Sequence, residues 1–192
     1  MSLVPDFELG LWNAWIFIVT SAVIPHLNAG KYKLRGIEEE MRRVEKEKKL
    51  LSALQVTMLA SLVYSVFLPL KLGTIWFYAG VPVCLVGLIM SLVAVVNFAT
   101  TPVDEPVTKG VYLFSRNPMY FFGFLTYIGV SVACASWLFL LLTVALMILL
   151  HVSVVSEERW CLEKYGDAYR EYMDRIPRWI GIPKSSNNKR ED

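Results

Sequence analysis

The side chains best able to do chemistry lie in two polar stretches that flank a long apolar run. Arg116 and Asn117 precede this run, and the adjacent carboxylates Glu157 and Glu158 follow it. Three tyrosines come next at helical spacing: Tyr165, Tyr169 and Tyr172. A carboxylate accepts hydrogen bonds from hydroxyl and amino groups, and aromatic rings attract cations. The two stretches together predict a pocket for a polar or cationic ligand.

Each of these features also has a structural interpretation. The pair Asn117-Pro118 is typical of a helix start, because Asn caps a helix and Pro fits its first turn. Two carboxylates at the end of a helix oppose its dipole and need a cationic partner, such as Arg116, Arg159 or Arg175. A tyrosine stripe is also favoured at a membrane interface. Both sets of interpretations stay open at this point.

Other chemistries are disfavoured. His26 and His151 are too few and too differently placed for a metal site, so no metal is predicted. No glycine-rich phosphate loop follows a strand. The three cysteines form no CxxC pair and predict no disulfide framework. The net charge of +2 argues against a nucleic-acid binder.

The elements that position these residues are predicted to be membrane spans. Of the 192 residues, 55% are hydrophobic and 19% are charged, and the mean hydropathy is +0.47. Charged residues are absent from four runs, at 9–30, 50–70, 72–103 and 117–156. A span needs about 20 residues, and the last run divides into two at the small residues 134–136. The sequence predicts an all-α integral membrane protein with spans at 9–30, 50–70, 74–98, 119–134 and 136–156.

The distribution of basic residues supports five spans. With five spans, 18 of the 19 Lys and Arg residues fall on one side of the membrane, and Lys71 alone falls on the other. The positive-inside rule then places the N-terminus outside or in a lumen and the C-terminus in the cytosol. Because Asp6 and Glu8 precede the first run, we expect a retained span and not a signal peptide. Residues 36–49 predict an amphipathic helix on the bilayer surface.

The motifs that follow the third span resemble a known family. They occur in the order Gly110-Val111-Tyr112, Arg116-Asn117-Pro118-Met119-Tyr120, Glu157-Glu158, Tyr165-Gly166-Asp167-Ala168-Tyr169-Arg170-Glu171-Tyr172 and Arg175-Ile176-Pro177. This set, which covers about residues 102–177, resembles the isoprenylcysteine carboxyl methyltransferase family. The likeness is to its small five-span prokaryotic members, an archaeal one among them.

The resemblance implies a cofactor, S-adenosylmethionine, with S-adenosylhomocysteine as product. The cytosolic segments 102–118 and 157–183 would form the cofactor pocket. The implied cofactor-binding residues are Asp104, Glu105, Pro106, Val107, Tyr112, Asn117, Pro118, Met119, Tyr120 and Glu157. Glu158 is either the second acidic ligand or a structural residue. The resemblance assigns no catalytic residue.

Two departures from the family concern the acceptor. Several members have His at the position of Asn117, and an amide cannot act as a proton donor and acceptor in the way His does. Eukaryotic members have an arginine, thought to meet the substrate carboxylate, at the position of Ser153. Arg116 or His151 is the candidate to replace that arginine here.

The implied reaction is carboxyl O-methylation of a prenylcysteine-like acceptor that reaches the site among membrane lipids. A carboxylate is ionised at neutral pH, so direct in-line transfer requires no general base. The alternative enzyme is a phospholipid N-methyltransferase, whose amine acceptor must lose a proton. A sterol-type reductase would need a basic site for NADPH. A non-enzymatic membrane scaffold or small transporter would bind no cofactor.

Overall fold

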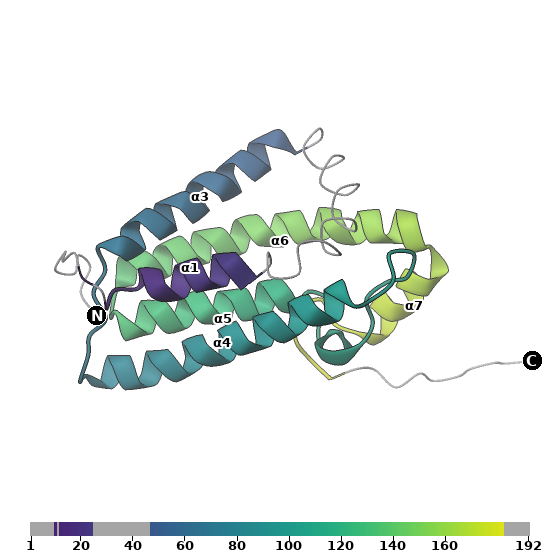
Figure 1. Cartoon of the computed structure of the whole chain (residues 1–192). Coiled ribbons are helices and arrows are strands. Elements are labelled where there is room, and N and C mark those ends of the chain that lie inside the picture. Colours follow the sequence, from purple (N-terminus) through teal and green to yellow (C-terminus); the bar gives the residue numbers. More distant parts are fainter. Residues whose placement is uncertain (1–9, 11, 25–46, 183–192) are drawn as a thin grey trace, which may run out of the picture.

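The structure, a computed structural model, describes residues 10, 12–24 and 47–182 of the chain (Figure 1). The described part contains six α-helices and one short 3-10 helix, and no strands beyond an isolated bridge between Asn13 and Pro69. The elements are α1 (Trp15–Val23), α3 (Lys48–Val66), α4 (Ile75–Ala99), η2 (Gly110–Leu113), α5 (Pro118–Ala133), α6 (Trp137–Tyr165) and α7 (Asp167–Arg175). The predicted all-α class is confirmed for these residues.

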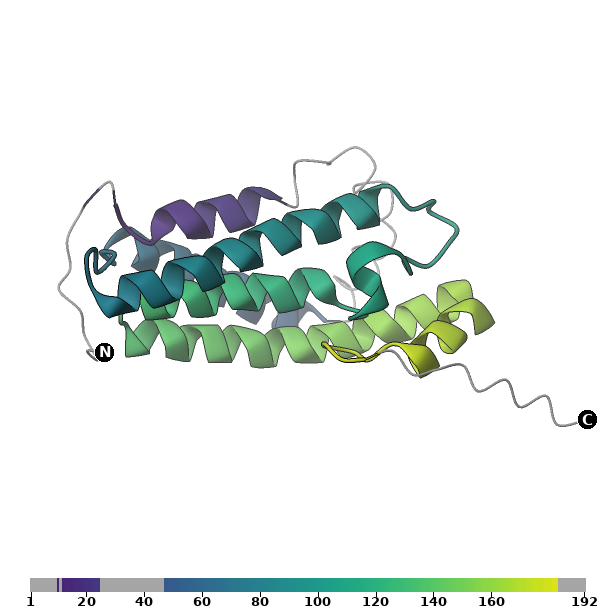
Figure 2. The same ribbon diagram turned by 90° about the horizontal axis from the view of Figure 1, so that it is seen from below.

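The long helices run alongside one another as a bundle. Figures 1 and 2 show α4, α5 and α6 side by side, with α1 against them, while α3 diverges from α6 along its length. The loop with η2 and the helix α7 lie at the end of the bundle opposite to the start of α1. The two predicted cytosolic segments, 102–118 and 157–183, therefore meet at one end.

Three helices, α3, α4 and α6, are long and apolar enough to cross a membrane. Helix α5 is apolar but has 16 residues, about 24 Å against a hydrocarbon core of about 30 Å. Helix α1 covers nine residues of the predicted span 9–30. The rest of that span from residue 25 on, His26, and most of the predicted surface helix at 36–49 lie outside the described residues. Five spans and the orientation of the termini stay predictions.

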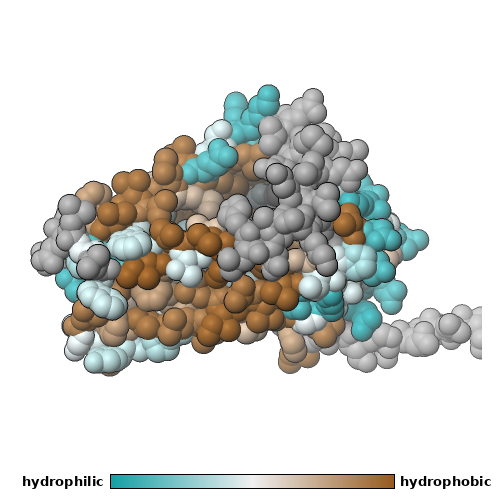
Figure 3. Space-filling model, viewed as in Figure 1, coloured by the Kyte–Doolittle hydropathy of each residue, from teal (hydrophilic) through white to brown (hydrophobic). Residues whose placement is uncertain are grey.

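The surface supports a membrane location. Figure 3 shows hydrophobic residues along the sides of the helices and hydrophilic residues at the end that carries α7. Large apolar side chains face outward, for example Ile89 (60% exposed), Leu141 (60%) and Ile148 (61%). An apolar surface that continues over the length of several helices is typical of contact with lipid or a partner. Together with the apolar spans, this surface indicates an integral membrane protein.

Helices α4 and α5 pack closely because glycines bring their backbones together. A Cβ on Gly129 would lie 2.7 Å from the Cα of Cys84, and one on Gly80 would lie 2.7 Å from the Cα of Ala133. Gly87 meets α5 in the same way, 2.8 Å from the carbonyl oxygen of Phe122. Small residues at such contacts are the usual means of packing helices in a membrane. This contact holds the start of α5 in place beside α4.

Two helices end at other residues than the predicted spans, and the turn predicted between the last two spans is present. The turn at 134–136 is present, with Ala135 at φ 49° and the Ser136 hydroxyl accepting a 3.2 Å hydrogen bond from the Phe139 amide. Helix α6 continues beyond the predicted span end at 156 to Tyr165, because charged residues such as those that follow 156 do not break a helix. Helix α3 ends at Val66 instead of 70, because the chain turns there and Leu68 accepts a hydrogen bond from Ala14.

The glycine contact gives a first prediction. We expect Gly129→Ala to lower the free energy of unfolding by about 1–3 kcal/mol, because the added methyl group forces α4 and α5 apart. The measurement is thermal unfolding of the detergent-purified protein. Gly123→Ala in the same helix is the control, since a Cβ there meets no described atom within 4 Å. Equal unfolding temperatures for both variants would contradict the prediction.

Candidate functional site

The start of α5 is fixed by hydrogen bonds to other segments. Asn117 occupies the N-cap position before Pro118, but its side chain makes no cap hydrogen bond. Its Nδ2 instead donates to Glu158 Oε1 at 3.0 Å and to the Arg178 carbonyl oxygen at 3.2 Å. The Asn117 amide donates to Ser115 Oγ at 3.1 Å. The helix start that the sequence predicts is present. The side-chain amide of Asn117 joins it to α6, through Glu158, and to the chain after α7, through Arg178.

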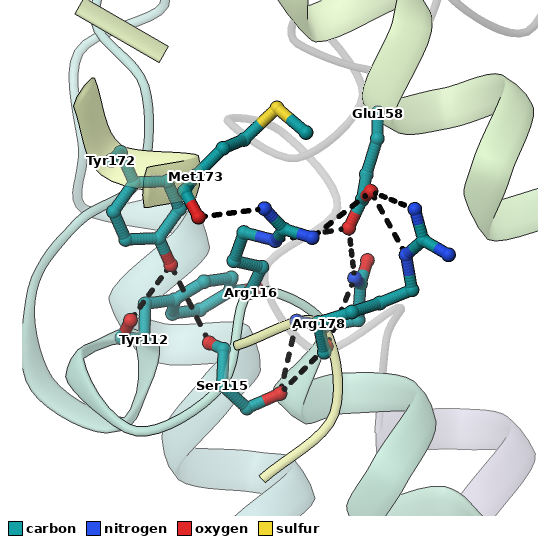
Figure 4. Close-up of polar contacts among 8 residues, drawn as sticks. Tyr112, Ser115, Arg116, Glu158, Tyr172, Met173 and Arg178 are labelled. Atoms are coloured by element: carbon teal, nitrogen blue, oxygen red, sulfur yellow. Dashed lines mark hydrogen bonds and ion pairs between the residues drawn. The ribbon is translucent and has the colours of Figure 1, made fainter. Parts of the chain in front are cut away.

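Glu158 is the centre of this arrangement (Figure 4). Its side chain is 3% exposed and meets two arginines. Arg178 donates from Nε at 3.0 Å to Oε2, and its Nη2 lies 2.9 Å from the same oxygen. Arg116 donates from Nη2 to Oε2 at 3.3 Å, while its Nε lies 3.2 Å from Oε1 without the alignment of a hydrogen bond. The structural interpretation of Glu158 is thus supported, with Arg178 and not Arg159 or Arg175 as the second partner.

The segment after α7 returns along the start of α5, and we call residues 177–181 the C-terminal strap. The Arg116 amide donates to the Pro177 carbonyl oxygen at 3.0 Å, and the Gly181 amide donates to that of Phe114 at 3.2 Å. The ring of Trp179 lies 5.9 Å from that of Phe124 and 5.7 Å from that of His151. The strap therefore covers part of the seam between α5 and α6.

The tyrosine stripe on α6 and α7 holds the η2 loop. Tyr172 Oη donates to the Tyr112 carbonyl oxygen at 2.7 Å, and Tyr165 Oη donates to that of Val103 at 3.1 Å. Burial raises the pKa of the Tyr169 and Tyr172 phenols above their ordinary value, so both stay protonated. Tyr169 and Tyr172 are buried and do not form the membrane-interface stripe that the spacing also allowed.

A polar cavity of about 60 Å³ lies between the η2 loop, the start of α5 and the end of α6. Among the residues that line it are nine that the sequence analysis named: Val107, Tyr112, Arg116, Asn117, Met119, Tyr120, Glu157, Tyr165 and Tyr169. The Tyr120 hydroxyl donates to Glu157 Oε2 at 2.8 Å. The adjacent glutamates thus differ: Glu157 faces the cavity, and Glu158 is buried among the arginines.

The other predicted site residues lie elsewhere. Asp104 and Glu105 are exposed and, like Pro106, do not line the cavity, because charged side chains in a loop remain in water. Pro118 is buried behind the cavity wall. Ser153 is buried within α6, and His151 stacks on Trp179. The binding roles of all these residues stay predictions.

Three lining residues were not predicted: Phe98, Trp160 and Cys161. Two of them share one helical signal with Glu157 and Tyr165, because positions 157, 160, 161 and 165 repeat every three or four residues along α6. That spacing was available in the sequence. Phe98 had no such signal, since it ends an apolar span and resembles its neighbours in composition.

A second, apolar cavity of about 400 Å³ adjoins the first. Its lining comes from α1, α3, α4, α5 and α6, and includes Met58, Val95, Gly123, Phe124, Tyr127 and Leu146. Met119 and Tyr120 line both cavities. The two cavities therefore share a wall at the first turn of α5, where a polar compartment borders an apolar one.

The arginine pairing gives the second prediction. We expect Glu158→Gln to lower the free energy of unfolding by about 3 kcal/mol, because it leaves two guanidinium groups without their buried carboxylate. Glu157→Gln, the matched control, is expected to change stability little, because Glu157 borders the cavity. Thermal unfolding in detergent measures both. A larger loss for Glu157→Gln would contradict the assignment of the two glutamates.

Comparison with known proteins finds a family model that matches part of the chain. The family model for phospholipid methyltransferases matches residues 77–168, a little under half of the chain. This family is part of the isoprenylcysteine carboxyl methyltransferase-like superfamily. No significant match was found among curated proteins or among solved structures. The matched segment contains α4, η2, α5 and α6 and ends where α7 begins. Over these residues the chain is similar to the phospholipid methyltransferase family.

Proposed function

We propose that this protein transfers a methyl group from S-adenosylmethionine to a lipophilic acceptor at the junction of the two cavities. The observation that carries this proposal is that Met119 and Tyr120 line both the polar and the apolar cavity. A reaction between a polar cofactor and a membrane lipid needs such a meeting point. A scaffold has no need of a cavity lined by Glu157, Arg116 and aromatic rings.

The chemistry of the polar cavity fits the cofactor. When bound, S-adenosylmethionine supplies an electrophilic methyl group on a positively charged sulfur. Glu157 would accept hydrogen bonds from its ribose hydroxyls or amino group.

The enclosed volume of the polar cavity is smaller than the cofactor requires. Small-molecule sites usually occupy about 300–1,000 Å³, whereas this cavity encloses about 60 Å³. Binding would therefore require the η2 loop or α7 to move outward. The hydrogen bond from Tyr172 to Tyr112 joins α7 to η2, and the one from Tyr165 joins the end of α6 to the loop at Val103. These are the contacts that such a movement would change.

The apolar cavity would hold the tail of the acceptor. Its volume of about 400 Å³ lies within the usual range for ligand sites. Its lining is formed by side chains from five helices, so a hydrocarbon chain there would bury apolar surface against the protein. The head of such a lipid would then lie at Tyr120, next to Glu157.

The charge arrangement favours an amine over a carboxylate as the acceptor. Arg116, the one cation that lines the polar cavity in the described part of the chain, is already paired with Glu158. An amine must lose a proton before or during methylation, and Glu157 Oε2 can receive it through the Tyr120 hydroxyl. We therefore favour the head group of a phospholipid amine, as the family name also indicates. The prenylcysteine carboxylate remains the alternative and would depend on Arg116.

A binding measurement gives the third prediction. Calorimetric titration of the detergent-purified protein with S-adenosylhomocysteine is expected to show saturable binding. Glu157→Ala should weaken it about 10- to 100-fold, because a hydrogen bond to a charged group is lost. Glu163→Ala on the exposed side of α6 is the matched control and should bind normally. Absence of binding by the folded wild type would refute the cofactor and leave the reductase, tested with NADPH, or the scaffold.

The choice of acceptor gives the fourth prediction. Radiolabelled methyl transfer is expected to phosphatidylethanolamine and not to a prenylcysteine acid, and Tyr120→Phe should lower that rate at least tenfold, since it removes the route for the proton. The label in a methyl ester is released as methanol by base, whereas an N-methyl label is retained. Base-labile label with normal activity of Tyr120→Phe would favour the carboxylate acceptor instead.

A further inference from the structure

Gly123 of α5 is not required by helix packing or by backbone conformation in the part of the chain that the structure describes. A glycine inside a helix costs about 1 kcal/mol relative to alanine. Gly80, Gly87 and Gly129 offset this cost, because each allows α4 and α5 to approach. At Gly123 an added Cβ would meet no described atom within 4 Å, and its φ is not positive. Neither packing nor backbone conformation in the described part of the chain requires glycine at this position.

The position of Gly123 offers a different reason. It lines the apolar cavity together with its neighbours Tyr120, Phe124 and Tyr127. It follows Tyr120 by three residues, so it lies about one helical turn from the junction on the same face of α5. The missing side chain keeps the cavity open immediately beside the point where the two cavities meet.

We propose that Gly123 determines which acceptors the site admits, by leaving room for a lipid that branches close to its reacting head. This inference rests on the proposed function and specifies the shape of the acceptor. The shared feature is bulk within a few bonds of the head, which both a two-chain glycerolipid and a methyl-branched isoprenoid carry. A single straight chain does not need this space. Larger side chains at position 123 should therefore exclude branched acceptors before straight ones.

The test is the series Gly123→Ala, Gly123→Val and Gly123→Leu, with Ala79→Leu as the control. Ala79 is exposed on α4 and lines neither cavity, so this control adds similar bulk outside the site. The acceptor pairs are phosphatidylethanolamine with its one-chain lyso form, and farnesylcysteine with a straight-chain alkylcysteine. Each pair keeps the same head and differs in branching, and the pair that is methylated identifies the source of the branch.

The expected result is a change in selectivity with an intact cofactor site. The ratio of kcat/KM for the branched over the straight acceptor should fall stepwise along the series, by at least tenfold for Gly123→Leu. The affinity for S-adenosylhomocysteine should stay within about twofold. Gly123→Ala should unfold at the same or a higher temperature, because alanine favours the helix. Ala79→Leu should change none of these.

A second readout separates the inference from the proposed function. Native mass spectrometry counts bound two-chain and one-chain lipid without any methyl transfer, and Gly123→Leu should shift this ratio towards the one-chain lipid relative to Ala79→Leu. If the shift occurs in a protein that transfers no methyl group, Gly123 keeps its role and the methyltransferase function fails. If the binding ratio and the kcat/KM ratio both stay unchanged in Gly123→Leu and Gly123→Ala, the role of Gly123 is refuted.

Discussion

The buried carboxylate of Glu158 is the constraint on which the rest of the site depends. A carboxylate that is 3% exposed is stable as an ion only when charges and hydrogen bonds replace its water. Arg116, Asn117 and Arg178 supply them from the segment before α5 and from the C-terminal strap. Because Asn117 directly precedes α5, the ion cluster also fixes the first turn of α5. That turn carries Met119 and Tyr120, where the two cavities meet.

The same cluster explains how two consecutive glutamates differ. Neighbouring side chains on a helix point about 100° apart, so Glu158 faces the arginines while Glu157 faces the polar cavity. Glu158 engages both cations, whereas the Glu157 carboxylate accepts a hydrogen bond from the Tyr120 hydroxyl. A carboxylate in this setting can accept hydrogen bonds from a ligand or receive a proton. The chemistry of the cavity therefore follows from how α6 directs two adjacent residues.

The sequence predicted features that are local and missed those that depend on packing. Runs without charge located α3, α4, α5 and α6 and the turn at 134–136, since hydropathy decides what enters a membrane. Hydropathy could not locate the end of α6, because a helix continues through charged residues. Arg178 and Trp179 follow no periodic pattern, and Asn117 had a sufficient local explanation as a cap. The apolar cavity is a gap between five helices, which no single segment of sequence encodes.

The C-terminal strap lies beyond the segment that matches the family, yet its consecutive residues Arg178 and Trp179 contact residues that line the two cavities. Arg178 binds Glu158, which in turn holds Arg116 and Asn117 in the wall of the polar cavity. Trp179 packs on Phe124, which lines the apolar cavity. Because Arg178 and Trp179 are adjacent in the chain, neither can move far without moving the other. A movement of α7 that opens the polar cavity would therefore also displace the wall of the apolar one.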